Sequence, residues 1–290
     1  MFGGTLTALV TPFRDGAVDE EALRALVDRQ IDAGIDGLAP CGSTGESATL
    51  SHAEHGRVVE VVLEAARGRV PVVAGTGSNN TREAIDLTRH AQETGAAGAL
   101  LISPYYNKPT QEGIIAHYEA VANETRFPLV VYNIPGRTAS NILPETVSRL
   151  AENPYIVGIK EASGDLEQMS QVIARCPDDF DVLSGDDAMT LPLLAIGGHG
   201  VISTTSNVAP ASVAGLVRSF RDGDAAGAQA AHRQLLPLFD VLFCETNPIP
   251  VKAALELMGQ IGAEIRLPLT PLTDPNRDRL QAVLKELGIL

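Results

Sequence analysis

Eight short apolar runs recur along the first two thirds of the chain, and helical patterns lie between them. Most of these runs are continuously apolar rather than alternating, which is typical of parallel strands covered on both faces. They are Leu6–Val10, Gly37–Pro40, Pro71–Gly75, Ala99–Ser103, Leu129–Asn133, Ile156–Lys160, Asp181–Ser184 and Gly200–Ser203. Eight such units predict an α/β fold that closes into a (β/α)8 TIM barrel.

The helical patterns set the expected domain organisation. Between the early strands they cover Glu20–Ala33, Ala53–Arg67, Arg82–Glu93, with Thr81 as a candidate N-cap, and Gln111–Glu124. After the eighth strand the pattern is helical only, over Pro210–Arg221, Asp224–Phe243, Ile249–Met258 and Pro275–Leu287. We therefore expect a barrel over residues 1–221 that carries the active site, and a C-terminal helical extension over residues 222–290. No linker separates them, so they should pack as one unit.

Composition excludes several classes of function. The net charge is −14 and no basic run is present, which argues against binding to nucleic acid or to an anionic membrane. No apolar run approaches the ~20 residues of a membrane span, and the N-terminus lacks a signal-peptide pattern. Three widely spaced cysteines (Cys41, Cys176 and Cys244) indicate reduced thiols in the cytoplasm. Neither they nor the six scattered histidines have metal-ligand spacing, so we expect no metal and no other cofactor.

Lys160 stands out because the chain holds four lysines against 18 arginines. It alone ends an apolar strand, whereas the other three lysines fall in loop or helix patterns. A lysine at that position loses hydration, which lowers its pKa and leaves a neutral amine that attacks ketones to form a Schiff base. The alternative is a buried lysine paired with a carboxylate, although the adjacent Glu161 points the other way if the strand alternates.

Neighbouring strand ends carry further candidates. Tyr132 ends the fifth strand, where a phenol can shuttle protons, and Arg137 follows in a position to grip a carboxylate. Their alternatives are a core tyrosine and a solvated surface arginine. The loop after the second strand, Cys41–Ser47, offers glycines, the hydroxyls of Ser43 and Thr44, and backbone N–H groups that can form an anion nest. An ordinary turn is the alternative there.

Six ordered motifs together resemble the 4-hydroxy-tetrahydrodipicolinate synthase family, also called dihydrodipicolinate synthases, within the pyruvate aldolases. The resemblance covers essentially the whole chain. The motifs are Gly-Ser-Thr-Gly-Glu-Ser (42–47), Pro-Tyr-Tyr-Asn-Lys-Pro (104–109), Tyr-Asn-Ile-Pro-Gly-Arg-Thr (132–138), Gly-Ile-Lys-Glu-Ala-Ser-Gly (158–164), Gly-His-Gly-Val-Ile-Ser (198–203) and Asn-Pro-Ile-Pro-Val-Lys (247–252).

The resemblance implies a metal-independent lyase that condenses pyruvate with L-aspartate 4-semialdehyde, in the diaminopimelate route to lysine. It implies that Lys160 forms the imine, that Tyr132 is the central proton donor and acceptor, and that Ser43 completes a relay. Tyr106 would join this relay from a partner subunit, since the family is usually a tetramer of two tight dimers. Thr44 and Ile202 would contact pyruvate, largely through backbone groups, and Arg137 would hold the carboxylate of the semialdehyde.

The resemblance also implies feedback inhibition by L-lysine. Seven positions match the effector site of lysine-sensitive members: Ser47, Ala48, His52, His55, Asn79, Glu83 and Tyr105. His52 and His55 are three residues apart and share one face if their segment is helical. Glu83 would meet the ammonium of free lysine. From the residues alone, the pairs His52/His55 and Asn79/Glu83 can equally be ordinary surface polar residues.

Three alternatives to the synthase remain. A sister aldolase, either N-acetylneuraminate lyase or a 2-keto-3-deoxy sugar-acid aldolase, shares much of the pattern, and Ser43 stands where the synthases commonly have threonine. Arg137 argues against both, because an anionic semialdehyde needs a cation and the sister lyases lack that arginine by resemblance. A non-catalytic barrel would not need the lysine, tyrosine and hydroxyl set. A metal-dependent aldolase would need a histidine cluster.

Overall fold

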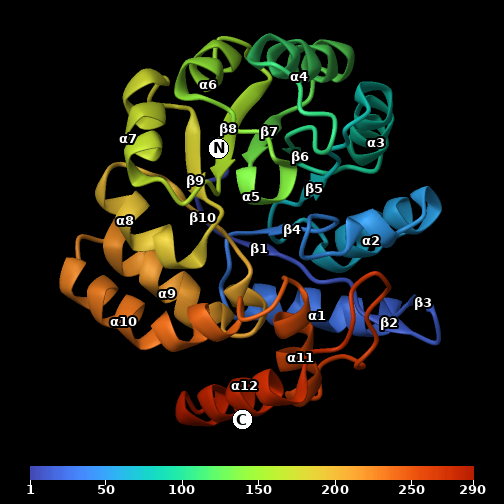
Figure 1. The fold of residues 1–290 in the computed structure, drawn as a ribbon, viewed down its shortest axis with the longest axis vertical. Coiled ribbons are helices and arrows are strands. Elements are labelled where there is room, and N and C mark those ends of the chain that lie inside the picture. The colour runs from blue at the N-terminus through green and yellow to red at the C-terminus, as the bar shows by residue number, and fades with distance from the viewer.

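The computed structural model describes residues 1–290, and eight parallel strands form its centre (Figure 1). They are β1 (Gly4–Ala8), β4 (Gly37–Ala39), β5 (Val73–Gly75), β6 (Gly98–Ile102), β7 (Leu129–Asn133), β8 (Ile156–Glu161), β9 (Asp181–Ser184) and β10 (Gly200–Ser203). Around the sheet their order is β4, β1, β10, β9, β8, β7, β6 and β5. A parallel bridge between Leu38 and Val72 joins β4 to the start of β5, so the predicted barrel is confirmed.

Helices surround the strands as a (β/α)8 barrel requires (Figure 1). They are α1 (Glu20–Asp32), α2 (His52–Ala66), α3 (Thr81–Glu93), α4 (Gln111–Thr125), α5 (Pro135–Thr138), α6 (Pro144–Leu150), α7 (Leu166–Arg175), α8 (Thr190–Ala195) and α9 (Pro210–Arg221). The predicted helices agree with α1 to α4 and α9 to within a residue or so at each end. A two-stranded hairpin, β2 (Phe13–Arg14) with β3 (Ala17–Val18), precedes α1.

Two local predictions were wrong, the end of the first strand and the N-cap of α3. The first strand ends at Ala8 rather than Val10, since the Val10 amide donates to the side chain of Asn207 at 3.2 Å. The N-cap of α3 is Asn80, whose side chain accepts from the Arg82 amide at 3.1 Å, instead of Thr81.

Alternation along the strands divides the buried side chains into two groups. A cluster of 10 residues fills the barrel interior, including Leu6, Val130, Tyr132 and Ile202, and a cluster of 62 packs between strands and helices. Lys160 of β8 pairs in register with Tyr132 of β7, so both side chains lie on the interior face. The inward direction of Lys160 therefore follows from the pleat of the sheet.

The C-terminal extension consists of α10 (Ala225–Val241), α11 (Ile249–Leu257) and α12 (Asp274–Glu286). α10 packs against α9, and α12 packs against both α10 and α11, at the bottom of the view in Figure 1. The proposed division at Arg221 coincides with the end of α9. No helix has the combination of length and apolar character needed to cross a bilayer.

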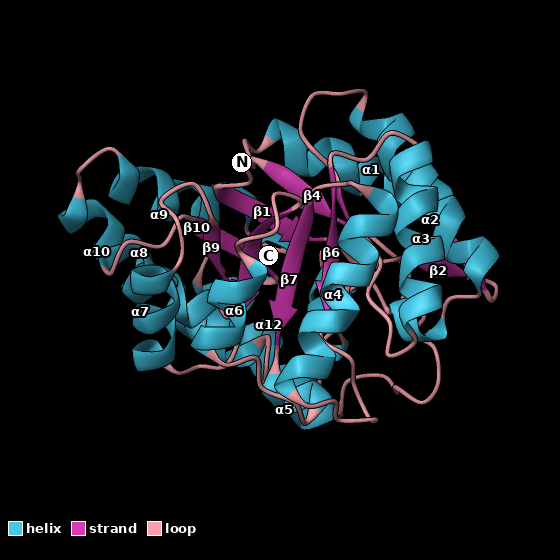
Figure 2. Cartoon of the chain, turned by 90° about the horizontal axis from the view of Figure 1, so that it is seen from above, coloured by secondary structure: helices cyan, strands magenta, loops and turns pink.

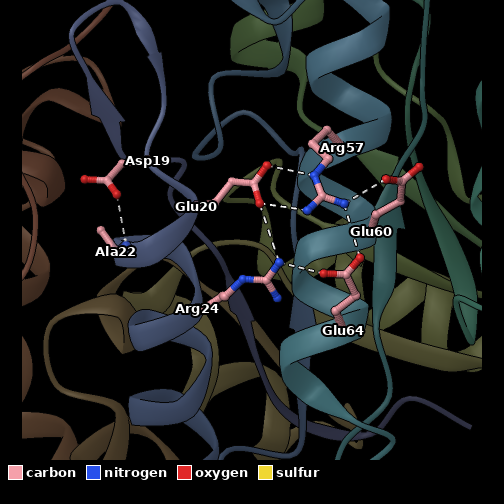
Figure 3. Close-up of polar contacts among 7 residues, drawn as sticks. All are labelled: Asp19, Glu20, Ala22, Arg24, Arg57, Glu60 and Glu64. Carbon is pink, nitrogen blue, oxygen red and sulfur yellow. Dashed lines mark hydrogen bonds and ion pairs between the residues drawn. The ribbon is translucent and has the colours of Figure 1, made fainter.

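The outer faces of α1 and α2 are joined by a network of charged side chains, drawn in Figure 3. Arg57 of α2 donates through Nε and Nη2 to the two carboxylate oxygens of Glu20 on α1, each at 2.7 Å. Arg24 of α1 reaches Glu64 of α2 at 2.6 Å. All four side chains are more than one third exposed, so the network fixes the register of the two helices more than it stabilises the fold.

Candidate active site

A cavity of about 430 Å³ opens at the end of the barrel where the strands point. Figure 2 shows β7 running towards α5, which lies at this end. The wall is built from the loops after β4 to β7, together with Asn247, Pro248, Pro268 and Leu269 of the C-terminal extension. Active sites of such barrels lie at this face. The extension therefore contributes to the cavity wall, beyond the barrel residues that the sequence analysis expected to carry the site.

Lys160 is buried and is not itself among the residues that line this cavity, but it lies against Tyr132, which does line it. Its Nζ is 4.3 Å from the centre of the Tyr132 ring. Burial lowers the pKa of Lys160 to about 8, while the charge of the nearby Asp187 acts in the opposite direction. A Cβ at position 185 would lie 3.0 Å from the Lys160 Cε, so Gly185 leaves room for the lysine chain. A neutral amine is therefore accessible near physiological pH.

Glu161 does not pair with this lysine. Its side chain is on the opposite face of β8, where the Asn133 Nδ2 donates to it at 3.1 Å and the Ser163 amide at 2.7 Å. Burial raises the pKa of Glu161. The alternative of a lysine neutralised by its sequence neighbour is thus excluded by strand alternation.

Tyr132 lines the cavity and is buried. Burial raises its pKa to about 12, with the charge of Arg137 and the hydroxyl of Ser43 acting in the opposite direction. Ser43 comes from the loop after β4, and it also lines the cavity. A protonated phenol, a serine hydroxyl and a lysine amine are thus brought together from β4, β7 and β8.

The loop of residues 41–47 folds back on itself. The amides of Gly45, Glu46 and Ser47 donate to carbonyls of Gly42 and Ser43 at 3.1–3.3 Å, so they are not available to an anion. The amides of Ser43 and Thr44 have no protein acceptor and remain available. The amides of Cys41 and Gly42 likewise have no acceptor, so the expected nest loses the three amides at the end of the loop and keeps those before them. A Cβ at position 75 would come within 2.2 Å of the Cys41 carbonyl oxygen, so only glycine permits this close approach.

Of the three predicted substrate-binding residues, only Arg137 lines the cavity, whereas Thr44 and Ile202 are buried and do not line it. Ile202, on β10, is fully buried in the barrel interior. Arg137 belongs to α5, is exposed, and lines the cavity, and its Nη2 donates to the main-chain oxygen of Asn247 at 2.8 Å. Its remaining donors are free to bind an anion that enters the cavity.

Tyr106 is not brought to the site of its own chain. Its side chain is 88% exposed, its φ of 72° lies in the left-handed region, and it does not line the cavity. Tyr105, beside it, does line the cavity, and its carbonyl oxygen accepts from the Asn79 Nδ2 at 3.1 Å. A role for Tyr106 within a partner subunit stays a prediction.

The residues predicted for an effector site share one end of this cavity. Six of the seven line the cavity: Ser47, Ala48, His52, His55, Glu83 and Tyr105. The seventh, Asn79, does not line it but donates a hydrogen bond to the carbonyl oxygen of Tyr105. Both histidines lie on α2. His52 Nε2 is 2.8 Å from the Glu83 Oε1, and the Ser78 hydroxyl also donates to Glu83. His55 Nε2 lies 2.7 Å from the Gly75 carbonyl oxygen, and burial lowers the pKa of its ring.

The sequence analysis did not predict that a second lysine, Lys252, is buried. Lys252 of α11 has its Nζ 2.5 Å from the Glu46 Oε1, and the two side chains are 4% and 1% exposed. Both stand in motifs of the family resemblance, and only their partnership was hidden, because 206 residues separate them. The sequence analysis also passed over Asn247, and Asp187, which accepts hydrogen bonds from the amides of Thr204 and Thr205 at 3.1 and 2.9 Å.

These features define a class of protein. A (β/α)8 barrel that holds an unpaired lysine of lowered pKa against a buried tyrosine is typical of lyases that use a lysine amine.

The chain belongs to the dihydrodipicolinate synthetase family, whose sequence profile matches residues 1–287. The 4-hydroxy-tetrahydrodipicolinate synthase of Syntrophus aciditrophicus is 58% identical over 290 residues, covering all of both chains. The pyruvate complex of the Acinetobacter baumannii synthase superposes with a TM-score of 0.98 at 44% identity over all of both chains. The lysine-bound synthase of Cyanidioschyzon merolae has a TM-score of 0.97 at 43% identity, covering 100% of this chain and 99% of its own. The chain is therefore an enzyme of the lyase class, as the sequence predicted.

Proposed function

We propose that this enzyme condenses pyruvate with L-aspartate 4-semialdehyde to 4-hydroxy-tetrahydrodipicolinate, on the route to diaminopimelate and lysine. The observation that carries the proposal is the buried lysine–tyrosine pair in the barrel interior, with the Lys160 Nζ 4.3 Å from the centre of the Tyr132 ring. The neutral amine of Lys160 attacks the ketone of pyruvate and, after loss of water, forms an imine. The imine loses a methyl proton, and the resulting enamine attacks the aldehyde carbon of the second substrate, whose oxygen takes up a proton. The amino group of that substrate then attacks the imine carbon, which closes the ring and releases the Lys160 amine.

The remaining residues have two roles: some transfer protons, and others bind the carboxylates of the substrates. Tyr132 keeps its proton near neutral pH, since burial raises its pKa to about 12, and it transfers protons during imine formation together with Ser43. The free amides at Ser43 and Thr44 bind the carboxylate of pyruvate beside Ile202, and Arg137 binds the carboxylate of the semialdehyde.

We further propose that the enzyme assembles as a homotetramer of two tight dimers, in which Tyr106 enters the site of a neighbouring copy. The Tyr106 side chain is 88% exposed on its own chain, so it is free to contact a partner subunit. The three cysteines are free thiols, which fits work in the reducing cytoplasm.

The substrates can be tested by product analysis. With pyruvate present, we expect turnover of L-aspartate 4-semialdehyde and no cleavage of N-acetylneuraminate, each followed by mass spectrometry. Arg137→Ala should raise the KM for the semialdehyde roughly 10- to 150-fold, because hydrogen bonds to a charged group contribute about 1.5–3 kcal/mol. Cleavage of N-acetylneuraminate at a comparable rate would favour the sister lyase instead.

Imine formation should depend on pH. Only the neutral amine reacts, so the rate rises as pH rises through the pKa of Lys160, which is about 8. At pH 7 roughly one tenth of the amine is neutral and at pH 9 roughly nine tenths, so we expect about a ninefold increase and then a plateau. Borohydride trapping of pyruvate in stopped time courses measures this rate. A midpoint near the ordinary lysine pKa of about 10.4 would contradict the burial argument.

We also propose that L-lysine inhibits the enzyme by binding at the end of the cavity that holds Glu83. Six of the seven effector residues, all but Asn79, line this cavity, and the structure of a relative from Cyanidioschyzon merolae has lysine bound. The Glu83 carboxylate would exchange its contact with His52 for the side-chain ammonium of the ligand.

Inhibition at millimolar L-lysine is the expected result. Glu83→Ala should raise the inhibitory concentration about tenfold or more, since a charge-assisted hydrogen bond contributes about 1.5–3 kcal/mol. Glu93→Ala, an exposed change at the far end of α3, is the matched control and should leave inhibition intact. Full activity of the wild-type enzyme in millimolar lysine would rule the proposal out.

A further inference from the structure

Asn247 lies between α10 and α11, outside the barrel, yet it touches two groups of the site. Its Nδ2 donates to the Thr44 Oγ1 at 2.9 Å, and its main-chain oxygen accepts from the Arg137 Nη2 at 2.8 Å. The side chain is buried and the residue lines the cavity. One residue of the C-terminal extension thus connects the loop after β4 with the helix after β7.

The loop that carries Thr44 has few other restraints on its inner side. The Thr44 hydroxyl has one other polar neighbour, the Thr204 Oγ1, at 3.3 Å, which is long for a hydrogen bond between hydroxyls. Two residues on, Glu46 is held by the Lys252 Nζ at 2.5 Å and by the Arg266 amide at 3.2 Å. The C-terminal extension therefore holds this loop at two points, Thr44 and Glu46.

We infer that Asn247 is a positioning residue for the ketoacid: its side chain holds Thr44 so that the two free amides of Ser43 and Thr44 face the carboxylate of pyruvate. This inference rests on the proposed function, in which those amides bind pyruvate. The contact of Asn247 with Arg137, which would bind the second substrate, is made by the main-chain oxygen of Asn247, and a side-chain substitution leaves that oxygen in place. A substitution of the Asn247 side chain therefore removes its contact with Thr44 and keeps its main-chain contact with Arg137.

Asn247→Ala is expected to raise the KM for pyruvate about three- to tenfold, the usual effect of losing one hydrogen bond, while the KM for the semialdehyde and kcat change less than about twofold. A loss of structure would affect both substrates alike, so the difference between them is the readout. Thr246→Ala, a change at an exposed neighbour, is the matched control and should leave both KM values unchanged.

A double-mutant cycle tests whether Asn247 acts through Thr44. Thr44→Val removes the acceptor while keeping the shape, so it should raise the KM for pyruvate by a similar factor. The double variant should then show no more than the larger single effect, because both changes remove one interaction. Effects that multiply would mean that Asn247 acts independently, and they would overturn the inference.

Borohydride trapping separates this inference from the proposed function. At saturating pyruvate, Asn247→Ala should still give full adduct on Lys160, which also shows that the variant is folded. Absence of an adduct in the wild-type enzyme would refute the proposed function and this inference with it. An adduct in the wild type, combined with an unchanged pyruvate KM or an equal rise of both KM values in Asn247→Ala, would overturn the positioning role alone.

Discussion

Lys160→Arg is expected to abolish covalent trapping of pyruvate and to lower kcat by at least about 10⁴-fold, since removal of a covalent nucleophile costs up to about 10⁶. Arginine keeps the length and charge of the side chain but stays protonated, so it cannot attack a ketone. The measurement is the mass of the intact protein after incubation with pyruvate and borohydride, followed by peptide mapping and a steady-state assay.

Lys285→Arg is the matched control, because Lys285 is an exposed residue in the last turn of α12. It should give the same adduct and the same rate as the wild-type enzyme. An adduct that persists in Lys160→Arg, or that maps to Lys252, would refute the assignment of the nucleophile.

The second large effect concerns stability. Glu46→Ala should lower the free energy of unfolding by about 3–5 kcal/mol, because it leaves the buried ammonium of Lys252 without its partner. Burial already lowers the pKa of Lys252, and the charge of Glu46 opposes that shift. Urea unfolding followed by circular dichroism at fixed protein concentration measures the change.

Two further variants test whether the loss of stability comes from an unpaired buried charge. Replacing both partners, by Glu46→Leu with Lys252→Met, should recover most of the loss, because no unpaired charge is then buried. Glu60→Ala removes a carboxylate from the exposed network of Figure 3 and should cost no more than about 1 kcal/mol. A loss in Glu46→Ala as small as that would contradict the burial argument.

The two buried lysines show where sequence reasoning succeeded and where it stopped. Lys160 was found because it ends an apolar strand, and the period of two along β8 correctly separated it from Glu161. Lys252 stands in a helical pattern, where no local rule distinguishes a solvated lysine from a buried one. Its partner Glu46 lies 206 residues away, so only packing of the extension against the barrel brings them together.

The site shows the same division. Strand ends of a barrel converge on one face, so Tyr132 and Lys160 could be placed together in advance. The anion nest could not be predicted in detail, because the loop uses three of its amides to close its own turn. The contact of Asn247 with Thr44 likewise depends on how the extension folds back over the loop.

The order of apolar runs was sufficient to predict the barrel, its eight strands to within two residues at their ends, and the lysine that faces its interior. These features depend on local periodicity and on the pleat of a strand, and both can be inferred from consecutive residues of the sequence. Tertiary structure decided which charges pair, which amides stay free and which residues of the extension wall the cavity. Those outcomes depend on contacts between residues distant in the chain, whose geometry no local pattern contains.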